Sequence, residues 1–398
     1  MPAFTSGRQT ARFDSMIFGL IVLLALTMAG CGTNSNNMTR PVPTPTPTPS
    51  PTPTPTPTPP PIPVTWDPTT SPLPAPPAVE PPPPAETSFP LSVSTPSNGA
   101  TVNSPAHVVA ASSPSNPILY MRVYVDGLAV YFTFEKSFDT LIWMAPGQHT
   151  LEVMAVDRKG FVSTSVMQVT VAAQSPFTVS NIQALPGWQT CSAVFPPEAA
   201  RHGQICAAGL GTAVVSMTPG QSTPSLDGNS TKFSIAGPTG YSNELWFNPV
   251  GGGNSVTHFV YDLWFLIDKP LASQALEFDI NQTFGGQRWT WGTECNFNAS
   301  GKWDIWDPLH ETWVPTSVDC KPFPANTWIH LIWNFERVNG KAHYISVTVD
   351  NQTFNVDQFF DPQQNWTLEE IDAAFQMDGN FTQEPYNVWL DKVNLQVF

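Results

Sequence analysis

Two carboxylates stand two residues apart in the segment ALEFDINQTF, residues 275–284. Glu277 and Asp279 alternate with apolar residues, and this period of two predicts a β-strand with one apolar and one acidic face. A pair of carboxyl groups can cleave a glycosidic bond when one protonates the leaving oxygen and the other attacks. Where a further carboxylate would complete such a site the chain has Gln282, and an amide cannot supply the proton.

The segment resembles the acidic strand of laminarinase-type glycoside hydrolases, which are built on the concanavalin A-like jelly roll and carry ExDxE or ExDxxE. The resemblance implies that Glu277 is the nucleophile position and Asp279 its support. The acid/base position falls on Asn281 or Gln282, so the full catalytic motif is lacking. Gln282 shares the face of Glu277 only if a bulge intervenes. An acid could instead come from another strand, the candidates being Glu294, Glu311 and Asp378.

Tryptophans are crowded directly after this strand, at positions 289, 291, 303, 306 and 313. Sugar rings stack their C–H faces on flat aromatic side chains, and amides and carboxylates bind their hydroxyl groups. In a large sandwich such tryptophans are also common in the core, and we expect at least half of them there. The predicted carbohydrate-binding residues are Glu277, Asp279, Gln282, Trp289, Trp291, Trp303 and Trp306.

Residues 178–398, which carry these side chains, read as one large all-β unit of short alternating segments. Its predicted hairpin turns include Asn339-Gly340 and Asp350-Asn351. Only TLEEIDAAF, residues 367–375, reads as helical, and GGGN at 251–254 reads as a loop. The closing segment NVWLDKVNLQVF resembles the last strand of concanavalin A-like lectin and glucanase domains, which implies a jelly-roll β-sandwich.

Residues 91–175 form a second predicted β-unit. The segment LYMRVYVDGLAVYFT predicts a hairpin that turns at Asp126-Gly127. From Val123 to Gly160 the chain resembles bacterial immunoglobulin-like domains, which implies a small β-sandwich that acts as a spacer or an adhesion module.

The N-terminal part reads as targeting sequence and linker. Residues 1–31 contain two arginines, the apolar run MIFGLIVLLALTMAG and then Cys31, as in a signal peptide. LTMAGC resembles the bacterial lipobox, which implies lipidation of Cys31 and a lipid anchor, with the outer membrane or cell surface as destination. A plain signal peptide or a short anchor helix is the alternative. Residues 32–90 form a Pro/Thr-rich linker that extends as polyproline II and cannot pack a core.

The net charge limits the possible binding partners, and the cysteine content indicates disulfides. The chain has 16 basic and 31 acidic residues and a formal net charge of −15, which does not suit a nucleic-acid partner. Four cysteines remain beside Cys31, and an even number in an exported chain favours disulfides. Of three possible connectivities we favour the local one, Cys191 with Cys206 and Cys295 with Cys320. No cofactor is expected, although Asp378-Gly379-Asn380 could hold a structural calcium instead of forming a simple turn.

Together these features predict an all-β surface lipoprotein that displays a non-catalytic, carbohydrate-binding jelly roll on a stalk and an immunoglobulin-like spacer. Its partner would be a polysaccharide or glycan, and it would meet the membrane only through the lipid anchor. One alternative is a glycoside hydrolase or a polysaccharide lyase on the same fold, and a lyase could recruit Arg288, His258 and Tyr261. A further alternative is a structural or adhesive surface protein.

Overall fold

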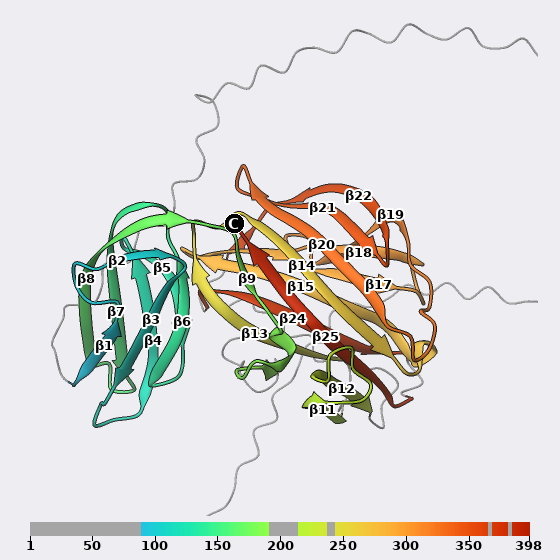
Figure 1. Cartoon of the computed structure of the whole chain (residues 1–398), viewed down its shortest axis with the longest axis horizontal. Helices are drawn as coiled ribbons and strands as arrows, with labels where there is room; N and C mark the ends of the chain where they lie inside the picture. The colour runs from blue at the N-terminus through green and yellow to red at the C-terminus, as the bar shows by residue number, and fades with distance from the viewer. Residues whose placement is uncertain (1–88, 191–213, 237–242, 365–367, 381–383) are drawn as a thin grey trace, which may run out of the picture. The chain divides into compact units, whose positions relative to one another are not determined.

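The fold was analysed in a computed structural model, which describes residues 89–190, 214–236, 243–364, 368–380 and 384–398. The described chain is almost entirely β-structure, as predicted (Figure 1). Its two helical segments are single 3-10 turns, η1 (Ile182–Ala184) and η2 (Pro270–Ala272). Among the described residues, no helix has the length and apolar character needed to cross a membrane. The predicted signal peptide, Cys31 and residues 32–88 of the Pro/Thr-rich linker lie outside the described residues.

The smaller of two sandwiches is built from the first eight strands. These are β1 (Leu91–Thr95), β2 (Thr101–Ser104), β3 (Ala106–Ser112), β4 (Ile118–Val125), β5 (Leu128–Thr133), β6 (Ser137–Trp143), β7 (Gly147–Asp157) and β8 (Val162–Gln174). Strands β2-β8-β7-β4-β5 form one sheet, and β1-β3-β6 face it. Asp126 and Gly127 both have positive φ and turn β4 into β5, so the predicted hairpin is confirmed.

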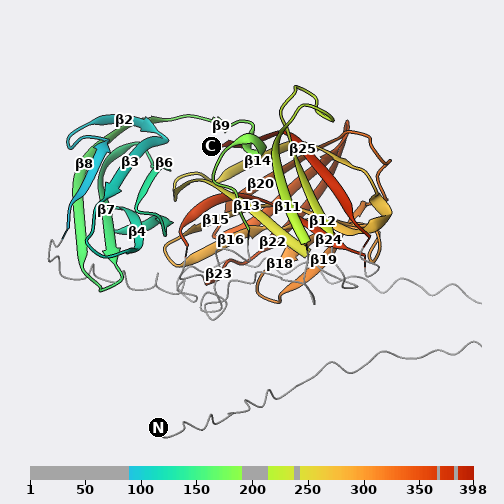
Figure 2. The same cartoon turned by 90° about the horizontal axis from the view of Figure 1, so that it is seen from below.

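The larger sandwich follows and contains the segments that the sequence singled out (Figure 2). Its strands are β9 (Phe177–Val179), β10 (Gln189–Thr190), β11 (Val214–Gln221), β12 (Ser230–Ala236), β13 (Asn243–Gly253), β14 (His258–Ile267), β15 (Ser273–Phe284), β16 (Gln287–Trp291), β17 (Thr293–Asn296), β18 (Lys302–Asp307), β19 (Thr312–Asp319), β20 (Ile329–Val338), β21 (Lys341–Val349), β22 (Gln352–Phe360), β23 (Gln363–Gln364), β24 (Glu370–Gly379) and β25 (Tyr386–Val397).

Two sheets enclose the core of the larger sandwich. One has the order β11-β12-β25-β14-β20-β21-β22, and the other contains β13-β24-β15-β17-β18-β19. Aromatic side chains from both sheets meet between them, with ring centroids of Phe265 and Phe278 5.1 Å apart and those of Trp303 and Trp333 5.7 Å apart. Strand alternation sends one set of side chains into this core and leaves the other set on the opposite face of each sheet.

The segment predicted to be helical at 367–375 is largely strand β24, which corrects that prediction. Strand β24 pairs with β13 on one side and with β15 on the other, and all ten of its residues are buried. Its composition favours helix, but hydrogen bonding to strands on both sides outweighs this local preference.

The two sandwiches are joined by hydrogen-bonded strands. Strand β6 pairs in parallel with the end of β13, where Gly252 and Gly253 lie opposite Ile142 and Trp143. The GGG segment is therefore strand and not the predicted loop. A Cβ on Gly252 would lie 2.1 Å from the carbonyl oxygen of Val130, so the close approach of the chains requires glycine there.

Candidate functional site

A pocket of about 310 Å³ opens on the face of the β13-to-β19 sheet that points away from the core. Its lining is polar and acidic, with two indoles. The lining residues are Asn243, Leu245, Gln274, Glu277, Asp279, Asn281, Arg288, Thr290, Gly292, Glu294, Asn296, Trp306, Trp313, Gln363, Gln376 and Asp378. We call this site the acidic pocket.

Strand β15 positions the two carboxylates from which the sequence argument began. Its apolar residues point into the core, and Glu277, Asp279 and Asn281 line the acidic pocket. Gln282, predicted with them, points the other way, because no bulge shifts the alternation over Glu277–Thr283. Its Nε2 donates to the carbonyl oxygen of Gly253 (3.0 Å), and its Oε1 accepts from Nε of Arg337 (2.9 Å). Gln282 is thus a core residue, and Asn281 lies in the pocket in its place.

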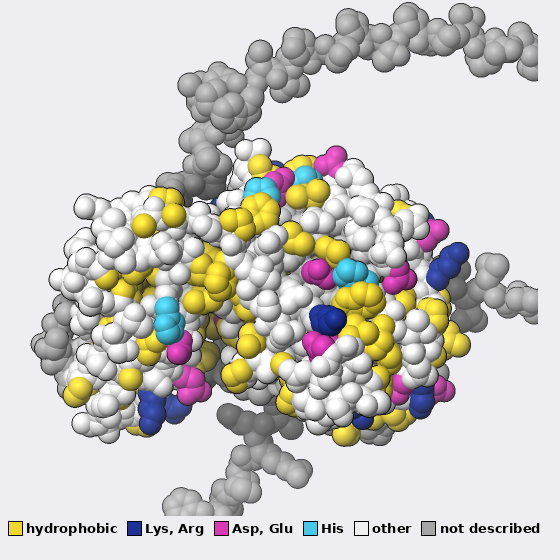
Figure 3. All heavy atoms as spheres, in the orientation of Figure 1, with side chains coloured by type: hydrophobic (Ala, Val, Ile, Leu, Met, Phe, Trp, Pro, Cys, Tyr) yellow, Lys and Arg dark blue, Asp and Glu magenta, His cyan; other side chains and the backbone are white. Residues whose placement is uncertain are grey.

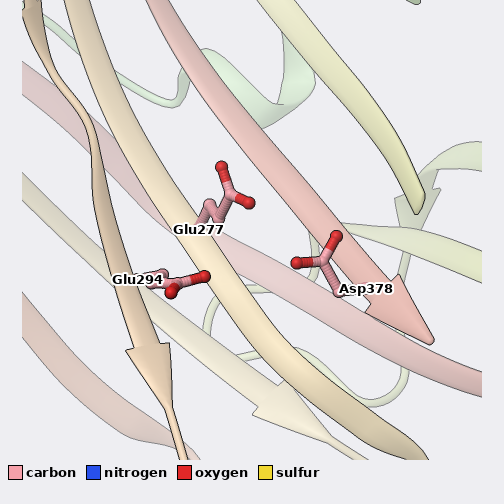
Figure 4. Close-up of side chains that lie close together, drawn as sticks. All are labelled: Glu277, Glu294 and Asp378. Atoms are coloured by element: carbon pink, nitrogen blue, oxygen red, sulfur yellow. The ribbon is translucent and has the colours of Figure 1, made fainter. Parts of the chain in front are cut away.

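Three carboxylates from three adjacent strands converge in the pocket (Figure 4). Glu294 on β17 lies directly opposite Glu277 in the β15–β17 ladder, and Asp378 comes from β24 on the other side. One oxygen of each lies within 4.8 Å of the others, and all three residues are buried. We call this group the carboxylate trio. Two of the residues named as possible substitutes for the missing acid, Glu294 and Asp378, therefore lie beside Glu277, whereas Glu311 is exposed and does not line the pocket.

The carboxylate trio could also hold a divalent cation, since Ca²⁺ and Mg²⁺ take oxygen ligands. The arrangement differs from the turn at Asp378-Gly379-Asn380, which was considered as a possible calcium site. Asp378 and Gly379 belong to strand β24, and Nδ2 of Asn380 donates to the carbonyl oxygen of Leu271 (2.7 Å). A calcium ion stays a prediction.

Burial dominates the electrostatics of the pocket carboxyls. It raises the pKa of Glu294 to about 9, with further repulsion from Asp378 and Asp304. Burial likewise raises the pKa of Asp378 to about 7, and that of Glu277 well above its ordinary value, with Asp378 and Asp279 adding repulsion there. The pKa of Asp279 rises to about 7, again mainly through burial. At neutral pH these groups therefore retain protons that exposed carboxyls would have lost.

Neutral donors from the protein hold the carboxyls in place. Nε2 of Gln376 donates to Oε1 of Glu277 and, at 3.1 Å, to Oδ1 of Asp378. Nδ2 of Asn296 donates to Oε1 of Glu294 (2.8 Å). These amides position the carboxyls but supply no positive charge, so they do little to favour the ionised form of the trio.

Only one of the four predicted tryptophans lines the pocket. Trp306 does so together with Trp313, its cross-strand partner, and the ring centroids lie 5.1 Å apart. Trp289, Trp291 and Trp303 are at most 3% exposed and belong to the core. Their position corrects the prediction that they present ring faces to a glycan.

The alternation of β16 explains why Trp289 and Trp291 are buried. Arg288 precedes Trp289, and Thr290 lies between the two tryptophans. Both of these residues face the pocket. The indole nitrogens of Trp289 and Trp291 donate to the carbonyl oxygens of Gly340 (2.8 Å) and His343 (3.2 Å), across the core.

Sequence reasoning missed several pocket residues. Gln376 comes directly after the segment 367–375 that was read as a helix, and Asn243 and Gln363 lie on strands remote in sequence. Trp313 was noticed in the tryptophan cluster but not placed in the site. Its signal was the hairpin from Lys302 to Asp319, in which it pairs with Trp306.

The residues considered for a lyase are not brought together. Arg288 lines the pocket, but Tyr261 is fully buried, and its hydroxyl donates to the carbonyl oxygen of Ala374 (3.4 Å). Nε2 of His258 lies 2.9 Å from Oε2 of Glu336, and neither residue lines the pocket. Histidines lie beside acidic side chains on the face shown in Figure 3 as well.

One predicted disulfide is present and supports the rim of the site. Cys295 and Cys320 are bonded, with their Cα atoms 5.6 Å apart, and they fix β17 to the end of β19. Cys191 and Cys206 lie outside the described residues, so their pairing stays a prediction.

Comparisons with known proteins give only distant likenesses. No family model matches the chain, and no curated protein matches it. Among solved structures, the cellulose induced protein Cip1 is 12% identical with a TM-score of 0.35, over 55% of this chain and 96% of that one. Carbohydrate-binding modules from the β-sandwich superfamily are 11% identical with a TM-score of 0.25, over 77% and 96%. The lectin-like defence protein arcelin-5 from Phaseolus vulgaris is 9% identical with a TM-score of 0.32, over 56% and 98%. At these TM-scores the likenesses carry no argument about ligand or activity.

Proposed function

We propose that the acidic pocket binds a glycan. The observation that carries the proposal is the combination of buried carboxyl and amide groups with two adjacent indoles in one pocket of about 310 Å³. A sugar ring needs both kinds of surface, because its hydroxyls call for hydrogen-bond partners and its C–H faces for a flat apolar wall. The volume is at the low end for small-molecule pockets, which suits one or two sugar units of a longer chain.

Sequence features favour an exported, membrane-anchored location for this pocket. The lipobox at Cys31 and the Pro/Thr-rich linker suit an exported protein that is lipid-anchored, in the outer membrane or at the cell surface, and held away from it. The smaller sandwich would act as the spacer. In this proposal the chain retains polysaccharide at the surface and does not cleave it.

Affinity electrophoresis through gels containing a panel of polysaccharides tests glycan binding. The wild-type protein should be retarded by at least one polysaccharide, and Trp306→Ala should migrate freely in that gel. Phe359→Ala is the matched control, because Phe359 is 47% exposed and lies on β22, outside the pocket. Equal retardation of the Trp306→Ala protein, or no retardation in any gel, would exclude the pocket as a glycan site.

A glycoside hydrolase is a second candidate, and the carboxylate trio favours it. Retaining glycosidases place their two carboxyl groups about 5 Å apart, close to the separation among Glu277, Glu294 and Asp378. Glu294, with a pKa of about 9, would hold the proton that the leaving oxygen requires, and Glu277 would be the nucleophile. This acid would come from the neighbouring strand and not from position 282.

Release of new reducing ends from the retained polysaccharide separates the two candidates. If the chain is a hydrolase, Glu277→Gln and Glu294→Gln should each abolish release and leave retardation in the gel intact. If the wild-type protein releases no reducing ends from a polysaccharide that it binds, the hydrolase candidate is ruled out and the binding proposal stands.

A further inference from the structure

The acidic pocket has an unbalanced charge. Four of its lining residues are acidic, Glu277, Asp279, Glu294 and Asp378, and Arg288 is the single cation among the lining residues. Within the described chain, none of the four carboxylates forms an ion pair with a lysine, arginine or histidine. Nε of Arg288 donates instead to Oδ1 of Asn281 (3.2 Å). The protein therefore supplies little positive charge that could compensate these carboxylates when they ionise, and this lack bears on which ligand fits.

The spacing of the carboxylate trio can accommodate an alkyl ammonium group. An alkyl ammonium has three N–H donors in a tetrahedral arrangement. Three oxygens that each accept one such bond at the usual charge-assisted distance lie about 4.6 Å from one another. The oxygens of Glu277, Glu294 and Asp378 lie within 4.8 Å of one another, so one ammonium nitrogen can reach all three.

Two further features of the pocket call for a ligand, and the second of them favours a sugar over a bare ion. Oε1 of Gln274, another lining residue, is buried and has no hydrogen-bond partner in the described structure. A buried acceptor without a donor is costly, so it calls for an N–H or O–H from a ligand. Trp306 and Trp313 line the same pocket and offer a ring wall that a metal ion would not use.

We propose that the acidic pocket selects glycans that carry a free amino group, with the ammonium of an amino sugar held by Glu277, Glu294 and Asp378. The inference rests on the glycan-binding function proposed above and names the class of sugar. Glycans with carboxylate groups are excluded from the same pocket, because their charge would be buried against like charge. Neutral sugars bind through the indoles and amides alone, and therefore more weakly.

Isothermal titration calorimetry with matched sugars tests the inference. Hexasaccharides are used in triplets that share ring stereochemistry and linkage and differ only in carrying a hydroxyl, a free amine at C2 or a carboxylate at C6. At pH 7.5 the amine member of the triplet that binds should be at least tenfold tighter than the hydroxyl member, and the carboxylate member at least tenfold weaker. Glu294→Gln should reduce the preference for the amine to less than threefold. Glu135→Gln, at an exposed position of the smaller sandwich, is the matched control and should keep the preference.

The outcomes separate the inference from the function on which it rests. If hydroxyl and amine members bind equally, or the carboxylate member binds best, the amino-sugar assignment is overturned and glycan binding stands. If no triplet binds, the proposed function fails together with the inference. If calcium chloride alone binds at micromolar concentration and displaces the amine member, the trio is a metal site and the ammonium assignment is overturned. Propylamine is included as a free ammonium, and if it binds as tightly as the amine hexasaccharide the sugar part of the assignment is wrong.

Discussion

Replacing Glu294 with glutamine should stabilise the protein, and more so as the pH rises. Burial raises the pKa of Glu294 from its ordinary 4.5 to about 9. A carboxyl with a higher pKa in the folded than in the unfolded state contributes its full stability below the unfolded pKa. That contribution is lost as the pH rises toward the folded pKa. The pH window of the effect is therefore about 4.5 to 9 for this residue.

The size of the effect follows from the two pKa values. At pH 8 the unfolded chain has lost this proton and the folded protein has kept it, which costs up to about 5 kcal/mol at 1.36 kcal/mol per pH unit. Relaxation and water entry reduce such costs, so we expect Glu294→Gln to gain about 2 kcal/mol or more at pH 8. At pH 5 the two proteins should agree within about 1 kcal/mol. The glutamine Oε1 can still accept from Nδ2 of Asn296, so the local hydrogen bond is kept.

Urea unfolding at pH 5, 6, 7 and 8 measures this directly. The wild-type midpoint should fall as the pH rises, with Asp279 and Asp378 contributing up to about pH 7, and the variant should fall less steeply. Glu135→Gln controls for the loss of one formal charge at an exposed site and should run parallel to wild type. Parallel curves for wild type and Glu294→Gln would refute the view that this carboxyl is buried without a compensating cation.

Four further variants test other parts of the structure. Trp306→Ala should weaken binding of a retained glycan about tenfold, measured by calorimetry, with little change in stability. Trp291→Ala should instead lower the unfolding free energy by about 3–5 kcal/mol, measured by urea unfolding. The reverse pattern would show that Trp291 lies in the pocket and Trp306 in the core. Gly252→Ala places a Cβ 2.1 Å from a carbonyl oxygen of β5 and should lower the unfolding free energy by at least about 2 kcal/mol, which a wild-type melting temperature would contradict. Replacing Cys295 and Cys320 together by alanine opens a loop of 25 residues and should cost about 3 kcal/mol, measured beside the wild type with and without reductant.

The fold class was accessible from the sequence because strand periodicity and turn chemistry are local signals. The Asp126-Gly127 and Asn339-Gly340 turns both have the positive φ angles that their residue types favour. Strand β24 was not accessible in the same way. Its acidic and alanine-rich sequence favours helix locally, and only its position between β13 and β15 makes it a strand.

The candidate site was predictable only along one strand. The alternation in β15 correctly places Glu277 and Asp279 on one face, but Gln282, which was predicted to bind with them, lies on the other face. Which way a neighbouring strand faces depends on register, and register is a property of the pairing and not of a single segment. This is why Glu294 could be named only as one of three possible acids, and why Trp289 and Trp291 were assigned to the wrong face.

The short ladder between β6 and the glycine-rich end of β13 affects how the larger sandwich would behave if it were expressed alone. A chain that began after β8 would expose unpaired backbone groups at that end of β13 and an empty slot where Trp143 now lies against Gly251 and Gly253. Uncovered strand edges recruit strands from other molecules. The isolated larger sandwich should therefore self-associate more readily than the whole chain, in which β6 covers this end of β13.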